Sequence, residues 1–454
     1  MDYNKLSSAR LLNRIFFHNR VRTMLSPSVL VLGVLSVGVP FALEVVPDYV
    51  QQHKACRQQD YQSILSAGFY YHRLTRLNRQ AERNRYTRLV TISEGSEGRD
   101  VLHQHCIARE LHSRLALVLL KAHPGAIVFD YRYTTDNCPT DSPSSRHLQA
   151  ALDAAVSDRI DVVLGLADLT QRELDSAEIG NSVARRLDPS EAILDPQQWH
   201  PVALGEQYVH YGLVRLQCEV ELLPLSWSTY TRSDLKKSER LPTLARATAE
   251  AFDPGVLSQG DVQKADADQI ELVVPFLTQK EIMQVSATRL LCGTDSGPGA
   301  WKNCAGENTS PALLHELSSH IVIVCSFGSD DRHATPIGGS VPGGVLQANY
   351  IEALLGGTYY QRANWLIGLA ISFGWFVALH RIWKRHEFSP VRALVMAVSL
   401  SVLIVVGAYV VFARLFNAWL ILWPPGAIAI VGKCMELLLT RRKERHGAQK
   451  IATS

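Results

Sequence analysis

Four long apolar stretches surround one large segment of mixed composition, and this layout constrains the fold more than any other feature of the chain. A helix needs about 20 apolar residues to cross a bilayer core about 30 Å thick. The stretches predict transmembrane helices at residues 24–46, 364–383, 393–412 and 415–433. The chain therefore divides into a membrane part and one intervening domain, residues 47–363.

Basic residues indicate which side of the membrane each segment occupies. Residues 1–23, the loop between the second and third predicted helices, and the tail at 434–454 are rich in Lys and Arg. Because Lys and Arg resist translocation, we expect both termini to be cytoplasmic and residues 47–363 to lie outside the membrane. A basic start before an apolar run also suits a cleaved signal peptide, but 24–46 is long for one, which favours an uncleaved anchor.

Overall charge excludes one class of partner. The 454 residues include 46 Lys and Arg against 43 Asp and Glu, a formal net charge of +3. No long basic stripe is present to neutralise a phosphate backbone, so nucleic-acid binding is not expected. We expect the partners to be the lipid bilayer and other proteins, among them further copies of the same chain.

Helical and strand patterns alternate along the outer segment. We expect the helices at 97–122, 145–157, 239–252, 311–320 and 347–355, and the strands at 126–129, 161–166, 271–274 and 321–326. Strands and helices that take turns are typical of an α/β domain with a mostly parallel, layered sheet and flanking helices. The predicted fold class is therefore this α/β domain plus four α-helical spans.

Seven of the eight cysteines fall in the outer segment, where an oxidising compartment permits disulfides. The odd number leaves at least one thiol unpaired, and Cys325, within an apolar strand pattern, is the expected free one. Cys292 and Cys304 flank a polar, glycine-containing loop, so a local disulfide between them is a candidate pairing. The remaining connectivity stays open.

Residues 320–357 resemble the closing signature of CHASE2 sensory domains. They combine an apolar strand, a polar loop with Asp331, Thr335-Pro336, Pro342-Gly343, and a helix with Ala348-Asn349 that ends in Leu354-Leu355. Here an additional Gly344 displaces the valine that would follow the glycine. One predicted span before the domain and three after it also match this family.

The resemblance implies an extracytoplasmic sensor in the inner membrane of a bacterium, which in this family usually feeds a cytoplasmic enzyme domain. Only a short tail follows the last predicted span in this sequence, so we expect the effector to be a separate protein. A scaffold subunit without a ligand is the alternative function. An envelope hydrolase that uses Ser329, His333 and Asp331 is a more distant alternative.

Polar residues beyond two predicted strands form the candidate ligand site. Ligands of α/β sheets bind beyond the carboxyl ends of strands. The site is expected to contain Asp130, Asp330, Asp331, Arg332, His333, Thr335 and Asn349. A competing interpretation is local turn chemistry, in which the aspartates cap the loop and pair with the arginine.

The sequence offers little support for catalysis, metals or cofactors, and none of these is expected. It has no nucleophile elbow and no phosphate-binding loop. His105, Cys106 and His112 on one predicted helix suggest metal ligands, but a solvated helix face is the favoured interpretation. Pro424-Pro425 interrupts the last predicted span, where it is either a signalling hinge or a tolerated kink.

Overall fold

The structure is a computed structural model that describes residues 84–362, with gaps of which the longest are 169–190 and 257–271, and residues 414–415. The chain divides into two units, one of residues 55–362 and one of all the others. The short strand β15 (Arg414–Leu415) is the described part of the second unit. Everything that follows concerns the first.

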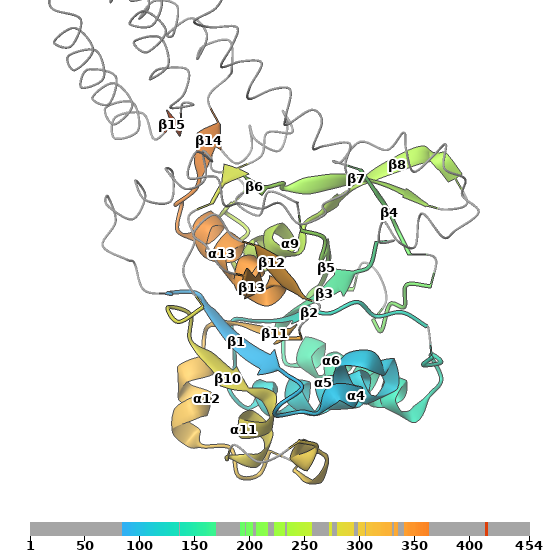
Figure 1. The fold of residues 1–454 in the computed structure, drawn as a ribbon, viewed down its shortest axis with the longest axis vertical. Helices are drawn as coiled ribbons and strands as arrows, with labels where there is room; N and C mark the ends of the chain where they lie inside the picture. The colour runs from blue at the N-terminus through green and yellow to red at the C-terminus, as the bar shows by residue number, and fades with distance from the viewer. Residues whose placement is uncertain are drawn as a thin grey trace, which may run out of the picture. The chain divides into compact units, whose positions relative to one another are not determined.

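A parallel sheet of six strands forms the centre of this unit (Figure 1). All its pairings are parallel, and its order is β10-β1-β11-β2-β3-β5. The strands are β1 (Thr87–Ile92), β2 (Ala126–Asp130), β3 (Asp161–Leu166), β5 (Val209–Leu213), β10 (Gln284–Ser286) and β11 (Ile321–Ser326). The expected α/β class with a mostly parallel sheet is therefore confirmed.

Helices cover both faces of the sheet (Figure 1). One face carries α4 (Arg99–His103), α5 (His105–Leu120), α6 (Pro143–Ser157), α11 (Ala287–Cys292) and α12 (Pro311–Leu317). The opposite face carries α9 (Leu244–Phe252) and α13 (Gly343–Leu355). Both faces of the central strands are buried, which explains why β2, β3 and β11 appear in the sequence as continuous apolar runs.

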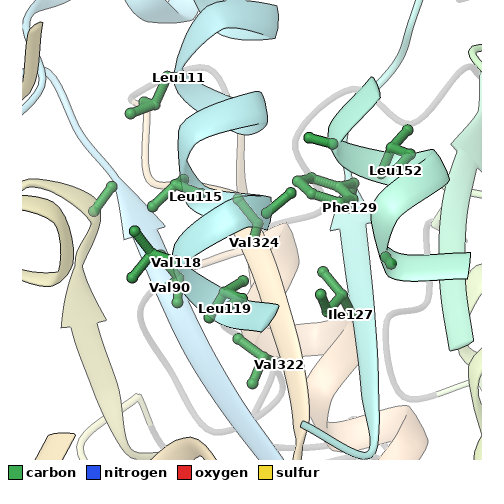
Figure 2. Close-up of a cluster of buried hydrophobic side chains, with 14 of the residues drawn as sticks. Val90, Leu111, Leu115, Val118, Leu119, Ile127, Phe129, Leu152, Val322 and Val324 are labelled. Atoms are coloured by element: carbon green, nitrogen blue, oxygen red, sulfur yellow. The ribbon is translucent and has the colours of Figure 1, made fainter. Parts of the chain in front are cut away.

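The alternation of side chains along each strand divides the core into two layers. Figure 2 shows Leu115 and Leu119 of α5 beside Val322 and Val324 of β11, with Ile127 and Phe129 of β2 in the same layer. Their neighbours Ile321, Ile323 and Cys325 point to the other side, against α13. Successive side chains of a strand point to opposite faces, so each central strand contributes to both layers.

Smaller sheets surround this core. β4 (Glu191–Ile193), β7 (Ser226–Thr231) and β8 (Asp234–Pro242) form one of them. Antiparallel pairs join β6 (Leu222–Leu223) and β14 (Tyr360–Arg362) to β9 (Leu272–Val273). The hairpin of β12 (Arg332–Ala334) and β13 (Ser340–Pro342) leads into α13, and one 3₁₀ turn occupies Ala300–Asn303.

Four expected helices differ from the structure. α12 ends at Leu317, three residues before the expected end, and α13 begins at Gly343, four residues before the expected start. The helix expected over 97–122 is divided at Gln104, whose extended backbone separates α4 from α5. The helix expected over 239–252 begins only at Leu244, because residues 239–242 belong to strand β8 and Thr243 is the N-cap. The Thr243 side chain accepts a hydrogen bond from the Arg246 amide, and such a bond marks the first turn of a helix.

The predicted membrane segments lie outside the described residues. These segments are 24–46, 364–383, 393–412 and 415–433, of which Leu415, in β15, is the one described residue. Residues 1–23, the 434–454 tail and Pro424-Pro425 also lie outside the described residues. Among the residues that the structure does describe, no helix has both the length and the apolar character needed to cross a bilayer.

Candidate functional site at the carboxyl edge of the sheet

The candidate site lies where β2 and β11 end side by side. Cys325 of β11 is in register with Asp130, the last residue of β2. The chain leaves β11, forms the β12–β13 hairpin and returns to this same edge as the first turn of α13. The ends of β2 and β11 and the first turn of α13 therefore meet at the carboxyl edge, which is where sheets of this class bind ligands.

Asp331 connects the hairpin to the start of α13. Its Oδ2 accepts a hydrogen bond from the Gly343 amide at 3.2 Å, and its main-chain oxygen accepts a second bond from the same amide. The Nε2 atom of His333 lies 3.3 Å from its Oδ1. A carboxylate at a helix N-terminus is stabilised by the unpaired amides and by the helix dipole. This contact fixes the first turn of α13 to the loop that follows β11.

Asp130 lies on the other side of that turn. Burial raises the pKa of Asp130 well above its ordinary value, and the negative charge of Asp331 raises it further. The same two causes, burial first and then the carboxylates of Asp130 and Asp331, raise the pKa of the Cys325 thiol. The site thus contains two interacting carboxyl groups and a protonated thiol.

Gly344 allows the helix to approach this cluster closely. A Cβ atom at Gly344 would lie 2.4 Å from the Cys325 sulfur and 3.6 Å from Oδ2 of Asp130. The first of these distances is far shorter than any real contact, so any side chain at this position would force α13 away from the strand ends. The additional glycine noted in the sequence therefore has a steric role.

The structure brings together three of the proposed site residues, namely Asp130, Asp331 and His333. Arg332 is exposed on the hairpin, where its Nη1 donates to the Ser340 main-chain oxygen at 3.2 Å. Asn349 is buried within α13, and its Nδ2 donates to the Val345 main-chain oxygen of the same helix at 2.8 Å. Asp330, Thr335 and Ser329 lie outside the described residues.

Two disulfides are present in the described part of the domain. Cys292 and Cys304 are bonded at 2.03 Å, which confirms that candidate pairing. Cys325 is a free, buried thiol, as expected. The second disulfide, Cys106–Cys138, was not predicted, because 32 residues separate its cysteines and no local pattern marks them as partners.

The expectation of a solvated face for the helix with His105, Cys106 and His112 is wrong. His112 is 1% exposed, and its Nδ1 lies 2.9 Å from the Tyr133 hydroxyl. Burial lowers the pKa of His112 to about 3, so the ring is neutral at physiological pH. Cys106 is held in its disulfide, and no group of three metal-binding side chains occurs among the described residues.

Arg109, on the same helix, is a structural residue of this region that the sequence did not reveal. It is fully buried, and its guanidinium lies 4.0 Å from the centre of the Trp199 ring. Its nitrogens donate to the main-chain oxygens of Thr134 and Cys138, in the loop that follows β2. Arg109 therefore organises the loop beyond the carboxyl edge rather than binding an anion.

A parallel α/β domain with a polar cluster at its carboxyl edge is the kind of domain that recognises ligands. The family model of the CHASE2 domain matches residues 55–382, well over half of the chain, so the chain belongs to the CHASE2 family of sensory domains. No curated protein and no solved structure matches the sequence.

Proposed function

We propose that this chain is the sensing subunit of a membrane signalling device, with its CHASE2 domain outside the bacterial cell membrane and its effector in a separate protein. The observation that carries the proposal is the arrangement of α13. Its first turn is held by Asp331 at the carboxyl edge, and the chain reaches the first predicted span after the domain soon after this helix ends.

The stimulus in this proposal acts at the carboxyl edge. The Asp331 carboxylate is a hydrogen-bond acceptor, and the Asp130 carboxyl, whose pKa is raised by burial, offers an acceptor oxygen and an O–H donor, so we expect a small ligand with N–H or O–H donors or a positive charge. Such a ligand competes with the Gly343 amide for the Asp331 carboxylate. It changes the signal only if it binds one position of α13 more tightly than another.

A thermal-shift experiment on the full-length protein in nanodiscs tests this site. The panel consists of amines, polyamines, amino acids and divalent cations, because these carry the donors and charges that the carboxylates favour. A compound that binds the folded state raises the unfolding midpoint by mass action. Asp331→Asn should abolish the shift. Asp253→Asn, which alters a carboxylate that accepts a local loop amide from Gly255 and lies outside the candidate site, should retain it.

If a compound still raises the unfolding midpoint of the Asp331→Asn variant, the compound binds at another site. A flat response to the whole panel would support the scaffold alternative. The effector is tested separately by purifying the tagged protein from its native membrane in mild detergent. A kinase, cyclase or transport subunit in stoichiometric amount supports the proposal, and a homogeneous oligomer of this chain alone contradicts a separate effector.

A further inference from the structure

The opposite end of α13 is hydrogen-bonded to the residues at the start of β1. The Glu352 carboxylate, in the last turn of α13, accepts hydrogen bonds from the main-chain amides of three consecutive residues. Its Oε1 accepts from the Tyr86 amide at 2.8 Å and from the Thr87 amide at 2.6 Å. Its Oε2 accepts from the Arg85 amide at 3.2 Å. We call this set of contacts the Glu352 clasp.

Two side chains complete the clasp. The Thr87 hydroxyl donates to Oε1 at 2.8 Å, and Nδ2 of Asn84 donates to the same oxygen at 3.2 Å. Five donors on four consecutive residues therefore converge on one carboxylate. Hydrogen bonds to a charged acceptor are about twice as strong as those between neutral groups. This is an unusual concentration of contacts for a single, half-buried glutamate.

The clasp joins the first described residues of the domain to the last turn of α13. Residues 84–87 begin the described domain and follow the segment from the first predicted span, whereas Glu352 comes shortly before the second. Beyond Glu352, Gly357 at φ 60° ends the helix and turns the chain toward β14. The helix α13 thus contacts the candidate ligand edge at one end and residues 84–87, at the start of the described domain, at the other.

We infer that Glu352 is the positioning residue that couples movement of α13 to the segment arriving from the first span. The inference rests on the proposed sensory function. A helix of 13 residues moves as a unit, so displacement of Gly343 at the carboxyl edge carries Glu352 with it. Since Glu352 holds three amides of the arriving chain, that segment must follow. Without the clasp, only the departing segment would respond.

Hydrogen exchange of the full-length protein in nanodiscs tests this coupling. Glu352→Gln removes the charge and turns one acceptor oxygen into a donor, at almost constant size. We expect the amides of Arg85, Tyr86 and Thr87 to exchange at least about tenfold faster. Glu250→Gln is the matched control, because Glu250 is a helical glutamate whose partner is Arg246 on its own helix. It should leave these amides unchanged.

A double-mutant cycle separates coupling from simple structural support. Asp331→Asn weakens the grip on the first turn of α13 and should change exchange at residues 84–87 in the otherwise wild-type protein. In the Glu352→Gln background that change should disappear. If Asp331 and Glu352 had independent structural roles, the effects of the two substitutions on exchange would instead be additive. Exchange in β11 should stay constant throughout as a check on folding. If Glu352→Gln does not fold, Glu352→Asp is measured by the same criteria.

Two results would overturn the inference. One is unchanged exchange at residues 85–87 in the Glu352 variant. The other is that Asp331→Asn leaves hydrogen exchange at residues 84–87 unchanged in the otherwise wild-type protein, or changes it equally in both backgrounds. Either result leaves the sensory function standing, because that function is judged by the thermal shift and by the co-purified effector.

Discussion

Replacement of Arg109 is the sharpest test of how the loop beyond the carboxyl edge is held. Arg109 is completely buried on α5, and no carboxylate pairs with it among the described residues. Its partners are instead main-chain oxygens of residues 134–139, the Ser145 hydroxyl and the Trp199 ring. Arg109→Ala removes the donor to the Thr134 and Cys138 oxygens, whereas the Pro139 oxygen still accepts from the Ser142 amide and the Ser145 hydroxyl.

The cost can be worked out from these contacts. A buried acceptor that loses its partner costs about 1–3 kcal/mol, and the oxygens of Thr134 and Cys138 are two such acceptors. Loss of the contact with Trp199 adds about 1 kcal/mol. Relief of the cost of burying an unpaired charge offsets part of this sum. We expect a net destabilisation of about 3 kcal/mol, or a fall of roughly 5 °C in Tm for a unit of this size.

The assay is thermal unfolding of the full-length protein in nanodiscs, followed by intrinsic tryptophan fluorescence. The matched control is Arg146→Ala on the neighbouring helix α6, where the arginine is exposed. Surface substitutions of this kind usually change stability by about 0.5 kcal/mol or less. If Arg109→Ala is no more destabilising than Arg146→Ala, then Arg109 does not hold the loop and the reasoning is refuted.

Two further predictions concern pH and covalent bonding. The pKa of Asp130 is raised in the folded state, so the folded protein retains a proton that the unfolded chain releases above about pH 4. The free energy of unfolding therefore falls as the pH rises from about 4 toward the pKa of the folded state. Asp130→Asn should therefore stabilise the protein at pH 7 and make no difference below about pH 4; an equal gain at both pH values in thermal unfolding would disprove this account. Removal of the Cys106–Cys138 disulfide by paired alanines should cost about 3.7 kcal/mol and removal of Cys292–Cys304 about 2.9 kcal/mol, since the first closes the longer loop. Guanidinium unfolding measures both, and the reverse order would show that loop entropy does not govern them.

The sequence predicted the buried centre of the fold better than its margins. β3 and β11 match their expected bounds because strands buried on both faces are short, continuous apolar runs. β1 was not expected, since its sequence TRLVTI mixes polar and apolar residues. Its partners lie far away in the chain, and only the tertiary structure supplies them.

The candidate site was predictable at the level of strand ends but not of contacts. The rule that ligands bind beyond strand ends placed Asp130 and Asp331 at one edge, and they do meet there. The roles of Arg109 and Glu352 were not predictable, because each depends on main-chain groups distant in sequence. The solvated face expected for His112 is wrong because aromatic rings distant in sequence, those of Phe129, Tyr131 and Tyr133, lie against it.

The strand order also has a consequence for how the protein is made. β11, one of the last strands in the sequence, lies between β1 and β2, which are among the first. Until residues 321–326 have emerged, β1 and β2 expose unpaired edges and the central layer cannot close. Folding that awaits a distant partner is slow and leaves those edges open to wrong pairings. We therefore expect newly made chains to depend on chaperones until β11 inserts.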